Sequence, residues 1–215
     1  MRLRYAFFIP AFLVSLGGAD AKEYSQSVKL SKGKAKVEFT AGTPEGARTG
    51  SSKNPRVGIA PSPTISFGNF LAQQLDATGR AVVVPPSRLS DASALNGGFD
   101  GLMRSELQSA ISGACRKEKL DYLLVLGTPQ PSMKTDITAY LLNPFARMRT
   151  RNNQESRLYD CRATQSVWVQ DVRLETSQSV VGSMNNLGAG FLGGPESERA
   201  MARLYVEKLI ADMGW

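Results

Sequence analysis

The stretch DYLLVLG, residues 121–127, decides the fold of this chain. Its five central residues are apolar or aromatic, and an aspartate and a glycine bound them. A short, almost wholly apolar run of this kind is typical of a strand that is covered on both faces. We therefore predict a central strand of a sheet here, and the segments on either side must supply the layers that cover it.

Two strand–helix units precede this strand. The runs RVGIAP (56–61) and RAVVVPP (80–86) are short, apolar and ended by prolines, so each predicts a buried strand. Residues 64–79 have apolar side chains at helical spacing and a terminal glycine, which predicts a helix with a glycine stop. Residues 99–120 predict a second amphipathic helix with one apolar face. The residues expected on that face are Met103, Leu107, Ala110, Ile111 and Ala114.

Strands cluster after the central strand. Residues 157–175 alternate between apolar and polar side chains, residues 176–179 have turn composition, and apolar residues return at 180–184. This pattern predicts a long hairpin with its turn at 176–179. Residues 196–213 carry a helical stripe of Met201, Leu204, Tyr205 and Leu209. The expected fold is α/β, with three helices and a mixed-direction sheet in the order β-α-β-α-β-β-β-α.

The N-terminus has the form of a secretory signal peptide. Arg2 and Arg4 precede an apolar run of twelve residues, Tyr5 to Leu16, and an A-x-A cleavage pattern follows at residues 19–21. The run is shorter than the about 20 residues of a membrane-spanning helix, although an uncleaved anchor is the alternative. We therefore predict that residues 1–21 are cleaved off and that the protein is exported to the periplasm.

The mature chain is expected to hold one domain. Residues 22–55 are predicted to be flexible or peripheral because their second half is rich in Gly, Ser, Thr and Pro. Their first half can form one or two short strands with Val37 and Phe39 on one face. Residues 56–215 form the single α/β domain, with an insertion at about 129–156 that mixes prolines, apolar residues and arginines.

Composition excludes several kinds of chemistry. The chain has no histidine, which excludes Ser-His-Asp and Cys-His catalysis and histidine-ligated metal sites. Its two cysteines cannot form a zinc site by themselves. The net charge of +7 comes from basic residues that are mostly spread along the chain, so it favours solubility over a dedicated anionic partner. We expect no cofactor and no metal.

The two cysteines, Cys115 and Cys161, are predicted to form a disulfide because two cysteines in an exported protein are commonly bridged. The bridge would close a loop of about 47 residues, for which chain entropy gives about 4 kcal/mol of stabilisation. The alternative is a pair of unbridged thiols that are buried in the core.

Four stretches carry a family resemblance. They are RVGIAP at 56–61, LAQQLDATGR at 71–80 before a VVV strand, DYLLVLG at 121–127, and VWVQDVRLETSQSVVGSM at 167–184. In this order they resemble the small α/β domain of bacterial envelope proteins, the group of the TolB N-terminal domain, CsgG and LpoB. The resemblance covers residues 56–213 and consists of hydrophobic and turn patterns. It implies export to the periplasm or outer membrane and binding of proteins or assembly into larger complexes, without catalytic residues.

The stretch GAGFLGG, residues 188–194, has the G-x-G-x-x-G spacing of a dinucleotide-binding loop. It precedes the last predicted helix, however, and not the first, and Glu196 and Glu198 in the following turn would repel a phosphate. Such spacing alone is a weak signal for a phosphate cradle. We expect a pliable connection whose Phe191 and Leu192 either fold onto the domain or contact a partner or membrane.

Residues 140–151 are the second candidate contact, since apolar side chains stand beside arginines there. They are Tyr140, Leu141, Leu142, Phe145, Arg147, Arg149 and Arg151. This composition suits a protein interface or a membrane surface. The alternative is an insertion whose apolar half packs on the core. Nucleic acid is not an expected partner, because the aromatic residues do not interleave with the arginines.

Glycan hydrolysis needs a pair of carboxylates, and six aspartates of the chain are candidates. They are Asp91, Asp100, Asp121, Asp136, Asp160 and Asp171. Nothing in the sequence brings two of them within the required about 5–10 Å. Asp121 and Asp171 stand at predicted strand boundaries, where capping and turn roles are common. We therefore expect that the protein is not an enzyme.

The function expected from the sequence is that of a periplasmic accessory or assembly factor of the cell envelope. It would bind envelope proteins, as part of a secretion or outer-membrane complex, and an open sheet edge is compatible with homo-oligomers. One alternative is binding of an anionic envelope polymer or membrane surface through Arg147, Arg149, Arg151 and Arg157. The other is a carboxylate-based glycan hydrolase.

Overall fold

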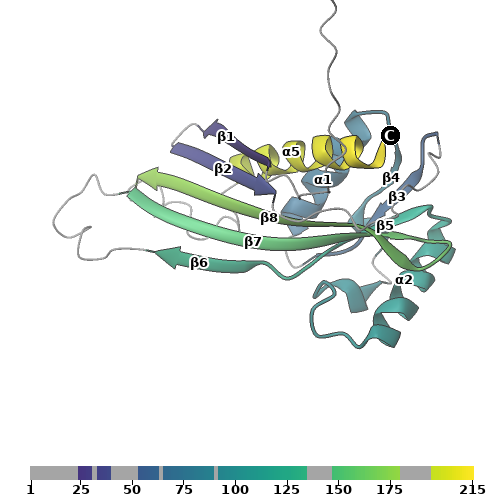
Figure 1. The fold of residues 1–215 in the computed structure, drawn as a ribbon. Coiled ribbons are helices and arrows are strands. Elements are labelled where there is room, and N and C mark those ends of the chain that lie inside the picture. Colours follow the sequence, from purple (N-terminus) through teal and green to yellow (C-terminus); the bar gives the residue numbers. More distant parts are fainter. Residues whose placement is uncertain are drawn as a thin grey trace, which may run out of the picture.

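The computed structural model describes residues 24–30, 33–39, 53–62, 65–89, 92–134, 147–179 and 195–215. These residues form one eight-stranded sheet with helices packed on it (Figure 1). The strand order is β1-β2-β8-β7-β5-β3-β4, and β6 pairs with β7 outside this path. The predicted α/β fold with a mixed-direction sheet is confirmed. The predicted signal peptide, residues 1–21, lies outside the described residues.

The first half of the domain is a parallel α/β unit. Its elements are β3 (Arg56–Ile59), α1 (Ile65–Ala77), β4 (Val82–Val84), α2 (Arg104–Glu118) and β5 (Tyr122–Leu126). Strand β3 pairs in parallel with both β4 and β5, so a helical connection follows each of the first two strands. All residues of β5 are buried, which confirms the prediction that this strand is internal to the sheet.

The remaining strands are antiparallel. They are β1 (Tyr24–Leu30), β2 (Gly33–Phe39), β6 (Gln130–Lys134), β7 (Arg147–Asp160) and β8 (Gln165–Ser179). β7 pairs with β5 on one side and with β8 on the other, and the β1–β2 hairpin extends the sheet from β8. The predicted order of helices and strands holds, and β6 is one strand more than expected.

The predicted hairpin exists, but its turn was predicted at the wrong place. Residues 176–179, which have turn composition, belong to β8, and the chain reverses between Asp160 and Gln165. The backbone N–H of Arg162 donates to the Asp160 carboxylate at 2.7 Å, and Thr164 has a φ of 53°. A capping aspartate followed by a left-handed residue is a common way to form such a turn.

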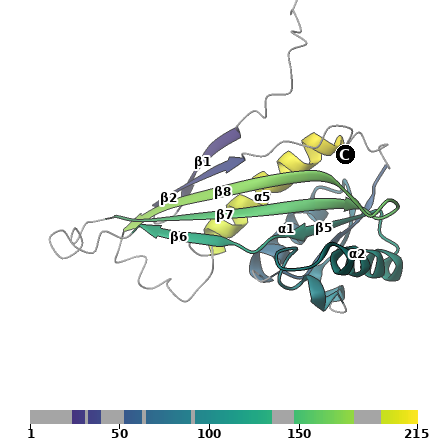
Figure 2. The same cartoon turned by 60° about the horizontal axis from the view of Figure 1, so that its bottom comes forward.

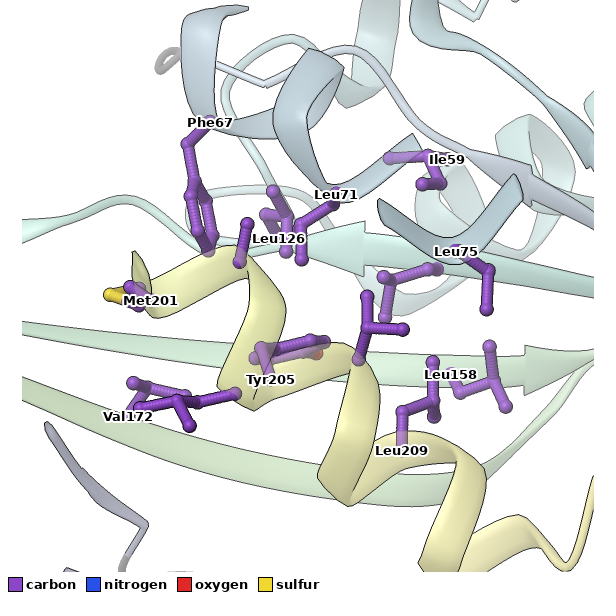
Figure 3. Packing of buried hydrophobic residues seen from close by; sticks show 14 of the residues in the cluster. Ile59, Phe67, Leu71, Leu75, Leu126, Leu158, Val172, Met201, Tyr205 and Leu209 are labelled. Atoms are coloured by element: carbon purple, nitrogen blue, oxygen red, sulfur yellow. The ribbon is translucent and has the colours of Figure 1, made fainter. Parts of the chain in front are cut away.

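Helices α1 and α5 (Pro195–Met213) cover one face of the sheet, and Figure 3 shows how their side chains meet those of the strands. The predicted stripe of α5 is buried as expected, and in α1 Phe67, Leu71 and Leu75 are buried while Phe70 is partly buried. The buried residues of these stripes are Phe67, Leu71, Leu75, Met201, Leu204, Tyr205 and Leu209. The Trp168 indole adds a polar link, since it donates to the Asp212 carboxylate at 2.8 Å.

Helix α2 covers the other face at the end of the sheet that holds β4, β5 and the last residues of β7 (Figure 2). Ile111 and Ala114 are buried there, and Leu107 and Ala110 are partly buried, as the sequence predicted. Met103 was wrongly included in this face: it precedes the helix and is 65% exposed. The residue that sits before the first helical turn points away because the chain has not yet taken up helical dihedrals.

The stretch expected as a flexible or peripheral N-terminal segment contributes to the core. Val37 and Phe39 lie on the same face of β2, as predicted, and both are buried against β8 and α5. Likewise, residues 130–134 and 147–156 of the expected insertion are strand residues of β6 and β7. None of the described helices is both long and apolar enough to cross a bilayer.

Candidate functional site

The two faces of the β7–β8 hairpin differ in chemistry. The inner face is buried under α1 and α5. The outer face bears mostly polar and charged side chains, and no described helix extends along it, because α2 reaches the hairpin only at its turn and at the last residues of β7 (Figures 1 and 2). With its neighbours from β2, we call this surface the charged face. Its residues are Lys36, Glu38, Arg151, Asn153, Glu155, Arg157, Asp171, Arg173 and Glu175.

Charges of opposite sign alternate across the strands of the charged face. Glu175 lies between Lys36 and Arg151 in the register, and its carboxylate is 3.6 Å from the Arg151 guanidinium. Arg173 lies 3.7 Å from the Glu38 carboxylate. A hydrogen bond and ion pair with Lys36, assisted by Arg173, hold the pKa of Glu38 below its usual value. The face is therefore internally compensated and not a uniformly basic surface.

The charged face is hollowed where it meets the end of β5. The hollow has a cavity volume of about 260 Å³. Its lining residues are Asp100, Thr128, Gln130, Asn153, Glu155, Asp171, Val172 and Arg173. Glu155 and Asp171 lie directly opposite each other in the β7–β8 register. Partial burial raises the pKa of Asp171, and the neighbouring Glu155 carboxylate raises it further.

The loop before α2 forms one wall of this hollow. The Asp100 carboxylate accepts a hydrogen bond from the Thr128 backbone N–H at 2.7 Å, and the Thr128 hydroxyl donates to the Gly97 carbonyl at 2.8 Å. Phe99 lies under the Arg157 guanidinium, whose centre is 4.3 Å from the ring centroid. Arg157 also donates to Glu155 at 2.6 Å. These contacts fix the position of the wall. They also occupy the carboxylates of Asp100 and Glu155, two of the charged groups that line the hollow.

The predicted aspartates have mostly structural roles. Asp121 accepts a hydrogen bond from the Arg56 backbone N–H at 2.8 Å, and Asp160 caps the hairpin turn, in line with capping roles. Asp171 was wrongly expected at a strand boundary: it lies within β8. Only Asp100 and Asp171 line the same hollow, whereas Asp91 and Asp136 lie outside the described residues. Among the described residues, no three His, Cys, Asp or Glu side chains form a metal-binding group.

The inner face of the hairpin carries an unusual line of buried polar side chains. The Tyr205 hydroxyl of α5 donates to the Ser156 hydroxyl at 2.6 Å, which donates to the Gln170 carbonyl at 3.0 Å. Complete burial raises the pKa of Tyr205. Gln154 donates through Nε2 to the Gly127 carbonyl at 3.1 Å. These residues were not predicted from the sequence. Polar side chains of an alternating strand were assigned to the solvent-exposed face, whereas these lie on the buried face.

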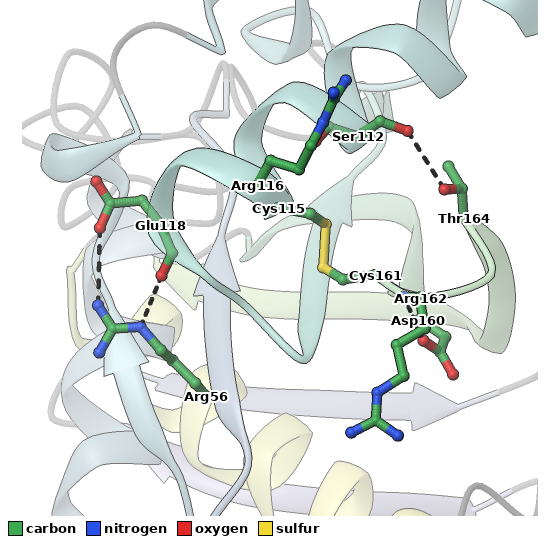
Figure 4. Close-up of a disulfide and its surroundings, with 9 residues drawn as sticks. All are labelled: Arg56, Ser112, Cys115, Arg116, Glu118, Asp160, Cys161, Arg162 and Thr164. Atoms are coloured by element: carbon green, nitrogen blue, oxygen red, sulfur yellow. Dashed lines mark hydrogen bonds and ion pairs between the residues drawn. A yellow bond between two sulfur atoms is a disulfide. The ribbon is translucent and has the colours of Figure 1, made fainter.

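The disulfide predicted from the sequence is present and joins Cys115 to Cys161 (Figure 4). It ties the buried Cys115, near the end of α2, to the start of the hairpin turn. A contact of 3.3 Å between the Ser112 and Thr164 hydroxyls supports the same junction. α2 and the β7–β8 hairpin are therefore held together covalently.

The structure separates the predicted contact residues. Arg151 is exposed on the charged face, and Arg147 and Arg149 precede it in the same strand, where Arg149 pairs with Lys134 and Ser177. The apolar part of that prediction, Tyr140, Leu141, Leu142 and Phe145, lies outside the described residues. So do Phe191 and Leu192 of the glycine-rich loop.

Several members of the charged face were not predicted from the sequence. They are Lys36, Glu38, Asn153, Glu155, Arg173 and Glu175. A signal was available, because charged residues recur at every second position in 171–175, as expected for one face of a strand.

The observed features define an α/β protein with a compensated charged face and a polar hollow. Three matched solved structures are the PelC dodecamer from Paraburkholderia phytofirmans (13% identity, TM-score 0.39), lipoprotein GNA1162 from Neisseria meningitidis (14%, 0.39) and CT253 from Chlamydia trachomatis (10%, 0.42). The matches cover 82%, 74% and 74% of this chain and 97%, 98% and 94% of the respective neighbour.

A bacterial lipoprotein is thus among the matches, while the specific kinship to TolB, CsgG and LpoB stays a prediction. At these identities and TM-scores the matches carry no inference about function. No family model matches the chain, and no curated protein matches it in sequence.

Proposed function

We propose that this protein is a non-enzymatic accessory or assembly factor of the bacterial cell envelope that binds a protein partner through its charged face. The charged face carries the proposal, because it is a broad sheet surface without a covering helix in the described part of the chain. Charges that alternate in sign favour a partner with the complementary arrangement, since complementarity sets register and specificity more than raw affinity. Interfaces of non-permanent complexes are about as polar as the rest of a protein surface.

The disulfide and the sequence of the N-terminus support a periplasmic location. Disulfides persist in oxidising compartments, and the Cys115–Cys161 bridge is of that kind. Export through a cleaved signal peptide would bring the folded domain to the compartment in which envelope complexes assemble. A second copy of the chain is one candidate partner, since β1 and β4 are outer strands of the sheet.

Site-specific photo-crosslinking in intact cells tests the proposal. A photo-reactive residue at Asn153, on the charged face, is expected to give a discrete adduct with one envelope protein or with a second copy. The same residue at Gln108, on the exposed side of α2, is the matched control and is expected to give none. Arg173→Glu places a like charge beside Glu38 and is expected to abolish the Asn153 adduct. Equal labelling from both positions would count against the proposal.

Binding of an anionic polymer or membrane surface is the second candidate, through Arg147, Arg149, Arg151 and Arg157. Arg151 and Arg157 each already contact a glutamate, which favours the protein partner over this candidate. A salt titration separates the two. Retention on an anionic polymer or on anionic vesicles would weaken steeply with salt, whereas adduct formation with a protein partner would persist at physiological ionic strength.

A glycan hydrolase is the least supported function, because Asp100 is used to hold Thr128 and Arg157 neutralises Glu155. Incubation of the protein with envelope fractions is expected to release no reducing sugar. Release that is lost in Asp171→Asn would instead assign an enzymatic function to the hollow.

A further inference from the structure

The interface between α5 and the sheet contains side-chain oxygens without a hydrogen-bond partner in the described part of the chain. They are Gln154 Oε1, Gln170 Oε1, Ser197 Oγ and Glu198 Oε1. Each of these four residues is at most 3% exposed. Buried polar atoms in folded proteins are usually paired, and an unpaired one calls for a specific explanation such as a bound water or ion. Such a set of atoms indicates that a group is bound there.

The hydrogen bonds of the amide fix which atoms are free. Gln154 Nε2 donates to the Gly127 carbonyl, so Oε1 must be the unpaired atom. Exchanging the two atoms would set two oxygens against each other, which excludes the flipped amide. The unpaired atoms are therefore acceptors, and an occupant must offer positive charge or hydrogen-bond donors.

Helix spacing, together with the known contacts of Tyr205 and Leu209, points to a position of Glu198 above Gln154. Glu198 and Tyr205 are seven residues apart, about two helical turns, so they share the sheet-facing stripe of α5. Tyr205 bonds Ser156, and Figure 3 shows Leu209, one turn later, beside Leu158. α5 therefore runs in the same direction as β7.

The same geometry sets the position along β7. Two turns before Tyr205 is about 10 Å, which equals about three residues of a strand. Three strand residues before Ser156, the inner face of β7 presents Gln154 and, beyond it, Asn152. Gln170 pairs with Ser156 in the register and lies further along, so we do not assign it to this group.

We propose that a calcium ion binds between the first turn of α5 and the inner face of β7. The ligands from the described residues are the Glu198 carboxylate, Gln154 Oε1 and Ser197 Oγ, with water completing the coordination. These are oxygen donors without nitrogen or sulfur, which suits a hard cation. Ca²⁺ accepts amide and hydroxyl oxygens in flexible geometry, whereas Mg²⁺ demands a regular octahedron. A single carboxylate predicts weak binding, in the range of about 10⁻⁴–10⁻³ M. The site is independent of the charged face.

Thermal unfolding of the intact mature protein tests the proposal. The protein is stripped with a chelator and dialysed into choline chloride, and CaCl₂, MgCl₂ or NaCl then replaces choline at constant ionic strength. CaCl₂ up to 10 mM is expected to raise Tm saturably by about 3–6 °C. MgCl₂ and NaCl are expected to do so much less. The absence of a saturable calcium response, or a larger response to either other cation, would overturn the proposal.

Variants locate the response. Glu198→Gln replaces the carboxylate by a neutral amide of nearly the same shape, so Tm without calcium is expected to be unchanged or higher, and the calcium response is expected to vanish. Ser197→Asp adds a carboxylate at a helix start, where acids are favoured, and is expected to lower the half-saturating calcium concentration several-fold. Glu207→Gln is the matched control on the exposed side of α5, 61% exposed, and keeps the wild-type response. A Glu198→Gln variant that still responds like wild type would exclude this site.

Discussion

Gly98 shows how one residue without a side chain shapes the hollow. It has a φ of 75°, and a Cβ at this position would lie 2.6 Å from the Leu126 carbonyl oxygen. The loop before α2 can therefore approach the end of β5 only with a glycine here. The neighbouring Gly97 has open space where a Cβ would lie, and its backbone is not left-handed. The two adjacent glycines thus have different structural roles.

The first prediction compares these glycines. Gly98→Ala is expected to lower the free energy of unfolding by about 1–3 kcal/mol, since it adds both backbone strain and a clash with a backbone atom. Gly97→Ala is expected to be neutral or to stabilise by up to about 1 kcal/mol, because alanine restricts the unfolded chain. Urea unfolding of both variants measures the difference. Equal effects of the two substitutions would contradict the close approach.

The second prediction concerns Asp171, whose pKa is raised by partial burial and by Glu155. Because the folded state holds this proton more tightly than the unfolded chain, the stabilising contribution is fully present below the ordinary aspartate pKa. It is lost as the pH rises through the raised folded value. At pH 7, Asp171→Asn is therefore expected to stabilise the protein by less than about 1 kcal/mol, as solvent screens the pair.

Urea unfolding at several pH values checks this sign. The gain from Asp171→Asn should shrink as the pH falls toward the ordinary aspartate pKa. It should also be smaller in a Glu155→Gln background, where the opposing carboxylate is absent. A gain that grows in acid would show that the charge of Asp171 is favourable in the folded state.

At the scale of elements, the disulfide joins α2 to the β7–β8 turn, two elements that are otherwise held by few polar contacts. The third prediction is that replacing Cys115 and Cys161 together by serine lowers the free energy of unfolding by about 4 kcal/mol, since a long loop is released in the unfolded chain. Urea unfolding with and without reductant measures this loss. Reductant should destabilise wild type similarly and leave the double variant unchanged. An insensitive wild type would contradict the prediction.

Helices and strands whose apolar residues recur at regular spacing could be predicted from the sequence, and those without such spacing could not. β5, α1 and α5 bury apolar side chains at regular spacing. The sequence therefore predicted correctly whether each is a strand or a helix and where it lies in the chain. The first half of β7 was missed because its inner residues Asn152, Gln154 and Ser156 are polar. The turn at 161–164 was not predicted because it contains an even number of residues. The alternation of side chains therefore continues in the same phase from β7 into β8, as it would in one uninterrupted strand.

The candidate site was predictable only where it is local in sequence. The cysteine pair followed from residue counting, and Arg151 from its neighbouring arginines. The hollow combines Asp100, Thr128, Glu155 and Asp171, which four separate segments contribute. Their proximity depends on the strand order β8-β7-β5, which the sequence pattern of each strand does not contain.

At the scale of the whole molecule, the sheet is a single structure that joins the N-terminal hairpin to the α/β unit. β2 pairs with β8 over seven residues and inserts Val37 and Phe39 into the core beneath α5. β1 and β2 thus have a structural role, although residues 22–55 were expected to be flexible or peripheral. Without it, β8 would become an outer strand of the sheet with part of its apolar inner face uncovered.

The fourth prediction follows from this arrangement. A chain that begins at Lys53 is expected to lose about 3–6 kcal/mol of unfolding free energy relative to one that begins at Lys22, since two fully buried side chains are worth about 1.5–3 kcal/mol each. It should also self-associate, because the free edge of β8 offers unpaired backbone groups. Urea unfolding and sedimentation measure the two effects. The full-length double variant Val37→Ala and Phe39→Ala is the control: it should lose similar stability and stay monodisperse, since its β2 still covers that edge. A shortened chain as stable as the longer one would mean that residues 56–215 fold without the hairpin.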